Sequence, residues 1–152
     1  AVRAEPPDAM VEQWVAKAES DFHDAERCLR ARPRSFNCHA CFHAYESADK
    51  YLKAILSKHG VRFRFTLPLS EAYARLERHR PEWREFRESA TFLDQFDQSI
   101  LYPGRSASLT EARAALVHCR IIRKHARRSL GLTTVGQRAV RRRISQRHDP
   151  VT

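Results

Sequence analysis

The sequence predicts an all-α protein, an antiparallel up-and-down bundle of four long helices with one additional short helix. Apolar residues recur at every third or fourth position over most of the chain, the spacing that places them on one face of a helix. The 152 residues include only four glycines, too few for a sheet-rich fold built on tight turns. Short loops separate the periodic segments, and such loops favour antiparallel neighbours.

The first two long helices are predicted from their caps and their apolar faces. Asp8 is a suitable N-cap for a helix over about residues 9–30. Ser35 is placed to cap a second helix, over about residues 36–59, which ends where Gly60 supplies a C′ residue. The apolar face of the first helix is Trp14, Val15, Ala18, Phe22, Ala25 and Leu29, and that of the second is Phe36, Ala40, Ala44, Ala48, Leu52, Ile55 and Leu56.

The middle of the chain predicts a connector, the short helix and the third long helix. Residues 61–65 alternate apolar and basic side chains, but five residues are too few for a sheet, so we expect an extended connector. A short helix then begins at Pro68 or Leu69 and ends near residue 79. Pro81 begins a longer helix whose apolar face is Trp83, Phe86, Ala90, Leu93, Phe96 and Ile100.

A capping box opens the last helix. Ser108 and Glu111 are three residues apart, so each side chain can accept a hydrogen bond from the backbone amide of the other residue. Apolar residues follow at helical spacing until Gly131. We therefore expect one helical domain over residues 8–131 and a basic C-terminal tail over residues 132–152.

The net charge of +10 is confined to the end of the chain. Residues 112–152 hold eleven basic residues and one acid, whereas residues 1–111 hold 17 of each sign. A neutral domain with a basic end attracts phosphates or an acidic partner, although a solubilising tail has the same composition. The candidates for nucleic-acid contact are Arg138, Arg141, Arg142, Arg143 and Arg147.

Other compositional features exclude several classes of protein. No apolar run approaches the 18 or so residues that a membrane span needs, and residues 1–8 have no signal-peptide core, so we expect a cytoplasmic protein. The four cysteines are too few and too irregular for a disulfide framework, and reduced thiols are expected. Cys38, His39, Cys41 and His43 have metal-ligating side chains, but they do not converge from one helix, so no metal is expected.

Three segments resemble the HEPN domain family. Residues 14–21, from Trp14 to Asp21, resemble its opening W-x-x-K-A-x-x-D pattern, and Phe42-His43-Ala44 with residues 50–56 resembles its second-helix signature, F-H-A followed by K-x-L-K-A-x-L. Tyr102-Pro103 resembles the R-Y-P turn before the final helix, with Leu101 where the family often has Arg. A Thr-Leu-Pro-Leu run stands where the family has H-D-L. The resemblance covers about residues 10–131.

The resemblance implies a four-helix bundle that often forms homodimers. Prokaryotic members commonly accompany a minimal nucleotidyltransferase in a two-component, toxin–antitoxin-like system, and other members bind nucleotides or cut RNA. We therefore expect a module without a cofactor that binds a nucleotide or a nucleic acid. The expected phosphate-facing residues are Lys50, Lys53, Arg62 and Arg64, and the polar face of the second helix carries His43 and Glu46, which could also be an ordinary solvated face.

The alternative function is a metal-independent ribonuclease. Such members use an Arg and a His separated by four to six residues, in which the cation stabilises phosphate charge and the imidazole transfers a proton. The spacing occurs here at Arg113 with His118, at Arg120 with His125, and at Arg34 with His39. Three occurrences are close to chance among 23 arginines and eight histidines, and the position that the family uses, near Leu101, lacks the Arg.

Overall fold

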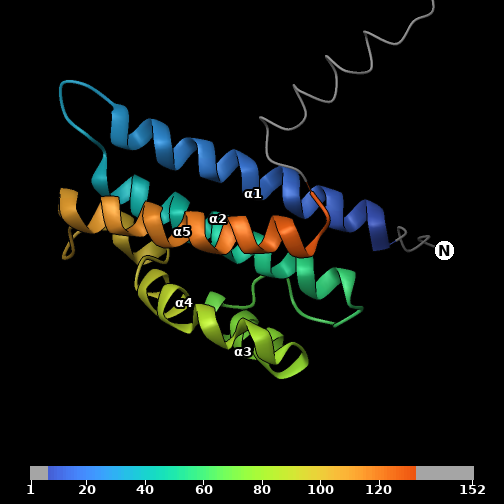
Figure 1. The fold of residues 1–152 in the computed structure, drawn as a ribbon. Helices are drawn as coiled ribbons and strands as arrows, with labels where there is room; N and C mark the ends of the chain where they lie inside the picture. Colours follow the sequence, from blue (N-terminus) through green and yellow to red (C-terminus); the bar gives the residue numbers. More distant parts are fainter. Residues whose placement is uncertain (1–6, 133–152) are drawn as a thin grey trace, which may run out of the picture.

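The computed structural model describes residues 7–132, and these residues form helices joined by loops (Figure 1). The order of elements is α1 (Pro7–Arg30), α2 (Asn37–Lys58), α3 (Leu69–His79), the 3₁₀ helix η1 (Pro81–Phe86), α4 (Arg87–Asp94), the 3₁₀ helix η2 (Gln98–Leu101) and α5 (Leu109–Ser129). The predicted all-α class is confirmed. None of the helices in this part of the chain combines the length and apolar character that a bilayer crossing requires.

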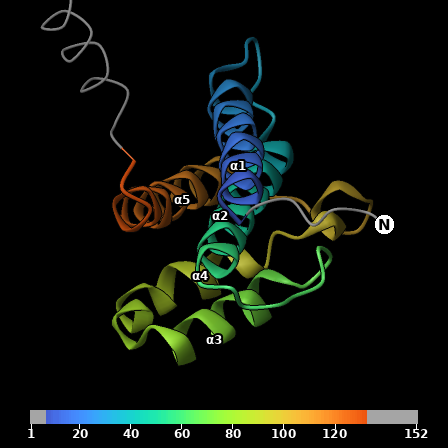
Figure 2. The ribbon, with the colours of Figure 1, turned by 90° about the vertical axis from the view of Figure 1, so that its right-hand side faces the viewer.

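The four helical segments of the bundle, which are α1, α2, the segment from η1 to η2, and α5, alternate in direction along the chain. The α2 and α5 helices run in the same direction, as two contacts show. The Ala107 amide donates a hydrogen bond to Cys38 Sγ near the starts of the two helices, and Lys58 Nζ donates one to the Ser129 carbonyl at their ends. The α1 helix and the segment from η1 to η2 run in the opposite direction. Viewed along the bundle, α2 lies at the centre, with α1 on one side and α3 and α4 on the other (Figure 2). The small residues of α2, among them the fully buried Ala44 and Ala48, allow this close packing.

The first two helices begin differently from the prediction. The α1 helix starts at Pro7, so Asp8 lies in its first turn rather than at its cap. The N-cap of α2 is Phe36, and no side chain caps this end. Ser35 instead donates its hydroxyl hydrogen bond back to the Leu29 carbonyl at the end of α1, which explains why it does not cap α2. The predicted end of α2 is confirmed, with Gly60 at a φ of 68° that favours glycine.

The prediction of one continuous helix from Pro81 to Ile100 is wrong. The segment is divided into η1, α4 and η2, although Trp83, Phe96 and Ile100 are buried as expected. The Asp97 carboxylate accepts a hydrogen bond from the Ser99 amide, a local bond that competes with a continuous α-helix. The capping box of Ser108 and Glu111 forms as predicted at the start of α5.

Candidate functional site

Two carboxylates on α1, Glu19 and Asp21, bind the polar groups that face them from the neighbouring helices; we call them the interhelical carboxylates. Asp21 accepts hydrogen bonds from His43, with 2.9 Å between Oδ1 and Nδ1, and from the ammonium of Lys50. Lys50 also donates to Glu46, one turn earlier on α2. His43 and Glu46, the predicted polar face of α2, therefore join a cluster that holds α1 to α2.

Glu19 connects three helices in the same way. Its carboxylate accepts the hydroxyl of Tyr51 from α2 and two hydrogen bonds from Arg123 of α5, at 3.0 and 3.1 Å. Arg127 adds a bond of 2.7 Å from Nη1 to Oε1. The guanidinium of Arg123 also lies over the Phe22 ring, 4.3 Å from its centroid. Glu19 is therefore fully engaged by side chains of the neighbouring helices.

The pairing between these groups shifts their pKa values in the direction that favours the charged forms. Burial opposes the ionisation of Asp21, but the hydrogen bonds from His43 and Lys50 outweigh it and lower the pKa of Asp21 below its ordinary value. The hydrogen bond to Asp21 raises the pKa of His43. Burial likewise opposes the charge of Glu19, yet hydrogen bonds from Arg123 and Tyr51 leave its pKa lowered.

Lys53 does not face a phosphate site as predicted, because it lies inside the bundle. The residue is 3% exposed, and its ammonium donates a hydrogen bond of 2.7 Å to the Asp49 carboxylate and one of 2.8 Å to the Phe65 carbonyl. Burial raises the pKa of Asp49 to about 6, although the charge of Lys53 opposes this shift. The sequence shows only an Asp and a Lys one helical turn apart, a spacing that is common on solvated faces. Lys50 is also engaged, by Asp21 and Glu46.

The buried lysine anchors the connector between α2 and α3, residues 59–68. Lys53 donates a hydrogen bond to the Phe65 carbonyl. Two backbone hydrogen bonds also restrain the connector, from the Val61 amide to the Leu56 carbonyl and from the Leu67 amide to the Arg64 carbonyl. Leu67, which belongs to the connector, is buried. These bonds restrain the loop, and such preorganisation lowers the entropic cost of binding a ligand.

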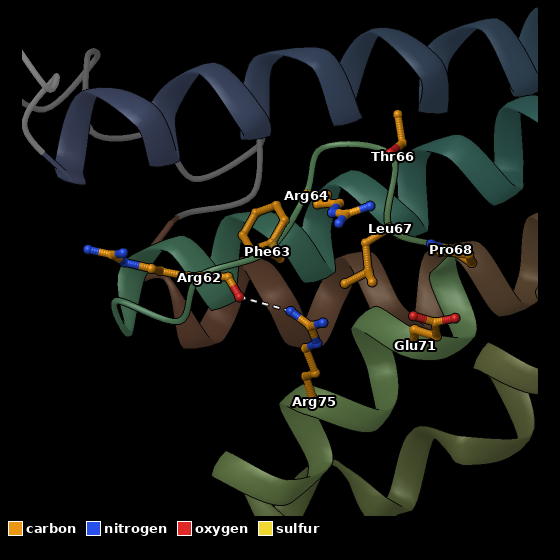
Figure 3. A pocket seen from close by; sticks show the side chains of 8 residues that line it. All are labelled: Arg62, Phe63, Arg64, Thr66, Leu67, Pro68, Glu71 and Arg75. Atoms are coloured by element: carbon orange, nitrogen blue, oxygen red, sulfur yellow. Dashed lines mark hydrogen bonds between the residues drawn. The ribbon is translucent and has the colours of Figure 1, made fainter. Parts of the chain in front are cut away.

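A hollow of about 550 Å³ opens between this connector and α3 (Figure 3). Its lining residues are Arg62, Phe63, Arg64, Thr66, Leu67, Pro68, Glu71 and Arg75. Arg75 Nη1 donates a hydrogen bond of 2.9 Å to the Arg62 carbonyl and so joins α3 to the connector at one end of the hollow. In Figure 3 the guanidinium of Arg62 points away from Arg75 toward the outer surface, whereas Arg64 extends along the connector toward Leu67.

Arg62 and Arg64 differ from the cations between the helices, such as Lys53, because both are exposed and lack partners. Other surface cations share this property, and the two arginines are set apart by their position beside the hollow. Within the described part of the chain, neither guanidinium takes part in a hydrogen bond or an ion pair. The structure therefore brings together two of the four predicted phosphate-facing residues, and Arg75 adds a third cation nearby. Sequence reasoning missed Arg75 and Glu71, which lie one helical turn apart on α3 and have an ordinary surface spacing.

The Arg–His pairs of the ribonuclease hypothesis do not converge within the described chain. Arg120 lies on the α1 side of α5, where it contacts Glu26 at 3.3 Å, and Arg113 lines a shallow hollow with the same glutamate. His118 faces α4 instead, with Nδ1 2.9 Å from the hydroxyl of Ser89. His125 packs against the rings of Trp83 and Phe86, at 4.6 and 4.2 Å between centroids, and burial lowers its pKa.

Among the residues that the structure describes, metal-ligating side chains gather at one place. Ligand atoms of Asp21, Asp24 and His43 lie within 4.8 Å of one another. The ammonium of Lys50 already binds Asp21 there, and a second cation would meet its repulsion. Cys38 and Cys41 face the core, where burial raises the pKa of Cys41 to about 12. The basic tail with Arg138, Arg141, Arg142, Arg143 and Arg147 lies outside the described residues.

Comparison with known proteins gives one match. The family model of the HEPN domain matches residues 11–129, most of the chain and all of its long helices. No curated protein matches the sequence, and no solved structure matches it. The matched range includes the interhelical carboxylates, the connector and the hollow.

Proposed function

The chain belongs to the HEPN domain family, and on that premise we propose that it is a binding module that engages the phosphates of a nucleotide or a nucleic acid at the connector. The observation that carries the proposal is the pair of exposed and unpartnered guanidiniums of Arg62 and Arg64 beside the hollow. Lys50, Lys53, Arg123 and Arg127, the cations that lie between the helices, are bound by carboxylates, whereas the pair beside the hollow is open to an external anion.

Phosphate suits these residues for geometric and electrostatic reasons. A guanidinium stays charged at every physiological pH, and it presents parallel N–H donors that match the oxygens of a phosphate. Arg75 also lines the hollow and raises the local positive potential. The buried pair of Lys53 and Asp49 contributes indirectly, because Lys53 holds the Phe65 carbonyl and with it the loop.

The basic tail is proposed to add affinity without a defined site. Its five arginines between residues 138 and 147 would neutralise further phosphates, and each contact releases condensed counterions. Binding to a nucleic acid should therefore weaken steeply as the salt concentration rises. A chain truncated after Leu132 should keep its thermal stability within a few degrees, since the described core ends there, and lose much of this salt dependence.

The experiment is a titration followed by fluorescence anisotropy, with a labelled RNA of twelve nucleotides and with labelled ATP. Arg62→Ala combined with Arg64→Ala should weaken binding of at least one of the two probes. The matched control is Arg34→Ala, which removes an exposed cation from the loop between α1 and α2, at the other end of α2. Wild-type protein that binds neither probe at low salt would contradict the proposal.

Two further parts of the proposal rest on family membership alone. The chain is proposed to form a homodimer and to act as the helical partner of a minimal nucleotidyltransferase in a toxin–antitoxin-like pair. Light scattering at tens of micromolar tests the first, and a strictly monomeric protein would contradict it. Co-expression with a nucleotidyltransferase encoded beside this chain tests the second, which requires the two proteins to purify together.

A further inference from the structure

Three aromatic side chains gather beside the hollow; we call Trp14, Phe63 and Phe65 the aromatic cluster. Trp14 of α1 lies edge-on to Phe65, with 5.2 Å between ring centroids and 82° between planes, and Phe63 lies 5.8 Å from Trp14. Phe63 and Phe65 are 6.5 Å apart. Because Phe63 also lines the hollow, the cluster and the arginines form one continuous surface.

Phe65 is the exposed member of this cluster. Its side chain is 65% exposed, the largest exposure among the large hydrophobic residues of the described chain. The residue is nevertheless held in place, because its carbonyl accepts a hydrogen bond from the buried ammonium of Lys53. Phe65 differs from the other exposed phenylalanine, Phe36, in lying beside two unpartnered guanidiniums, where its ring offers a flat apolar face to a ligand that also carries phosphates.

We propose that this surface binds single-stranded RNA, with a base stacked on Phe65 and the neighbouring phosphates on Arg62 and Arg64. The inference rests on the proposed function and names its ligand class. Bases stack on aromatic side chains with little dependence on sequence, while basic residues follow the backbone. The guanidiniums of Arg62 and Arg64 extend in opposite directions along the connector, so they would contact separate phosphates of one strand (Figure 3).

The carboxylate in the hollow distinguishes RNA from DNA. Glu71 lines the hollow with Arg64 and Arg75, yet no ion pair within the described residues engages it (Figure 3). A carboxylate repels a phosphate but accepts a hydrogen bond from a hydroxyl group. The ribose 2′-hydroxyl is such a donor, and it is the group by which a protein distinguishes RNA from DNA. A base-paired duplex hides the faces of its bases and would contact only the arginines.

The test uses the full-length chain and four labelled probes in anisotropy titrations at one low salt concentration. The probes are a twelve-nucleotide single-stranded RNA, the DNA of the same sequence, the RNA duplex and ATP. The key variant is Phe65→Ala, and its matched control is Phe36→Ala, which removes another exposed phenylalanine, 58% exposed, at the other end of α2. Circular dichroism confirms that each variant is folded.

We expect Phe65→Ala to weaken single-stranded RNA binding by about 5- to 160-fold, the range found when one stacked base loses its aromatic partner. Binding of the duplex should change little, Phe36→Ala should match the wild type, and Phe65→Tyr should retain affinity. Glu71→Gln should reduce the preference for RNA over DNA, because the amide accepts a hydrogen bond more weakly than a carboxylate.

The failures of the two proposals are distinguishable. If Phe65→Ala and Phe36→Ala bind the RNA equally well while the double arginine variant binds it weakly, the stacking inference is overturned and the proposed function stands. If the wild-type chain binds none of the four probes, the proposed function itself fails. Equal affinity of the wild type for RNA and DNA would overturn the assignment to RNA.

Discussion

The interhelical carboxylates and the connector differ in whether their charged side chains have partners within the protein. On α1, Glu19 and Asp21 are each bound by two or more polar groups from other helices, so the charged groups of this region are engaged within the bundle. On the connector, Arg62 and Arg64 are exposed and unpartnered in the described chain. The difference indicates that the first region stabilises the bundle and the second is available to a ligand.

Lys53 connects the two regions. It lies on the same helix as His43 and Lys50, and it forms a buried ion pair with Asp49, as a structural residue would. It also donates to the carbonyl of the exposed Phe65 in the connector. A change at Lys53 should therefore affect both stability and binding, whereas a change in either region should affect only one of them.

The largest expected effect is that of Lys53→Ala. Removal of one partner from a buried ion pair leaves the other without compensation and typically costs about 3–5 kcal/mol. We expect a loss of that order in the free energy of unfolding, measured by urea denaturation, together with weaker RNA binding because Phe65 is released. Lys17→Ala, at an exposed position on α1, is the control and should change neither quantity.

Asp21→Ala should have the next largest effect, and on stability alone. It leaves the half-buried His43 and Lys50 without their shared acceptor, a loss of about 2–3 kcal/mol for hydrogen bonds to a charged group. The matched control is Asp24→Ala, which removes a more exposed carboxylate paired with Arg27 and should cost less than about 1 kcal/mol. Equal losses in the two variants would show that the Asp21 cluster adds nothing to the bundle.

A smaller effect is expected on the pH dependence of stability. The hydrogen bond to Asp21 raises the pKa of His43 above 6.5, so the folded chain keeps this proton to higher pH than the unfolded chain does. The contribution of His43 is fully present below pH 6.5 and is lost as the pH rises through the folded pKa. The wild type should therefore lose stability above pH 6.5 in thermal melts, and His43→Gln should lose less over the same range.

The smallest effect on stability should come from the connector. Arg62→Ala combined with Arg64→Ala removes two exposed and unpartnered guanidiniums, and such changes usually alter stability by less than about 0.5 kcal/mol. The same double variant is the one expected to lose phosphate affinity. A loss of stability comparable to that of Asp21→Ala would show that these arginines have structural partners and would remove the contrast between the two regions.

The sequence was most informative where a structural signal is local. The helical periodicity and the capping box of Ser108 and Glu111 predicted the elements that the structure contains, because both depend on residues within one turn of each other. The continuous helix from Pro81 was predicted wrongly, since Asp97 adds a local hydrogen bond that interrupts it. Ser35 was assigned as a cap, but its hydroxyl group bonds to the preceding helix instead.

The candidate site was predicted only in part, for a different reason. Arg62 and Arg64 could be selected from the sequence because the connector alternates basic and apolar residues outside any helix. The bond from Lys53 to the Phe65 carbonyl, the bond from Arg75 to the Arg62 carbonyl, and the packing of Trp14 against Phe65 join residues that are between 12 and 51 positions apart. No local pattern encodes those contacts.

The sequence by itself therefore determined the helical class, the ends of most helices and the segregation of positive charge, because each follows from neighbouring residues. The tertiary structure decided which charges are neutralised and which remain available. That distinction depends on the distances between side chains from different helices, since the same lysine or arginine is a structural ion-pair partner when a carboxylate faces it and a binding residue when none does.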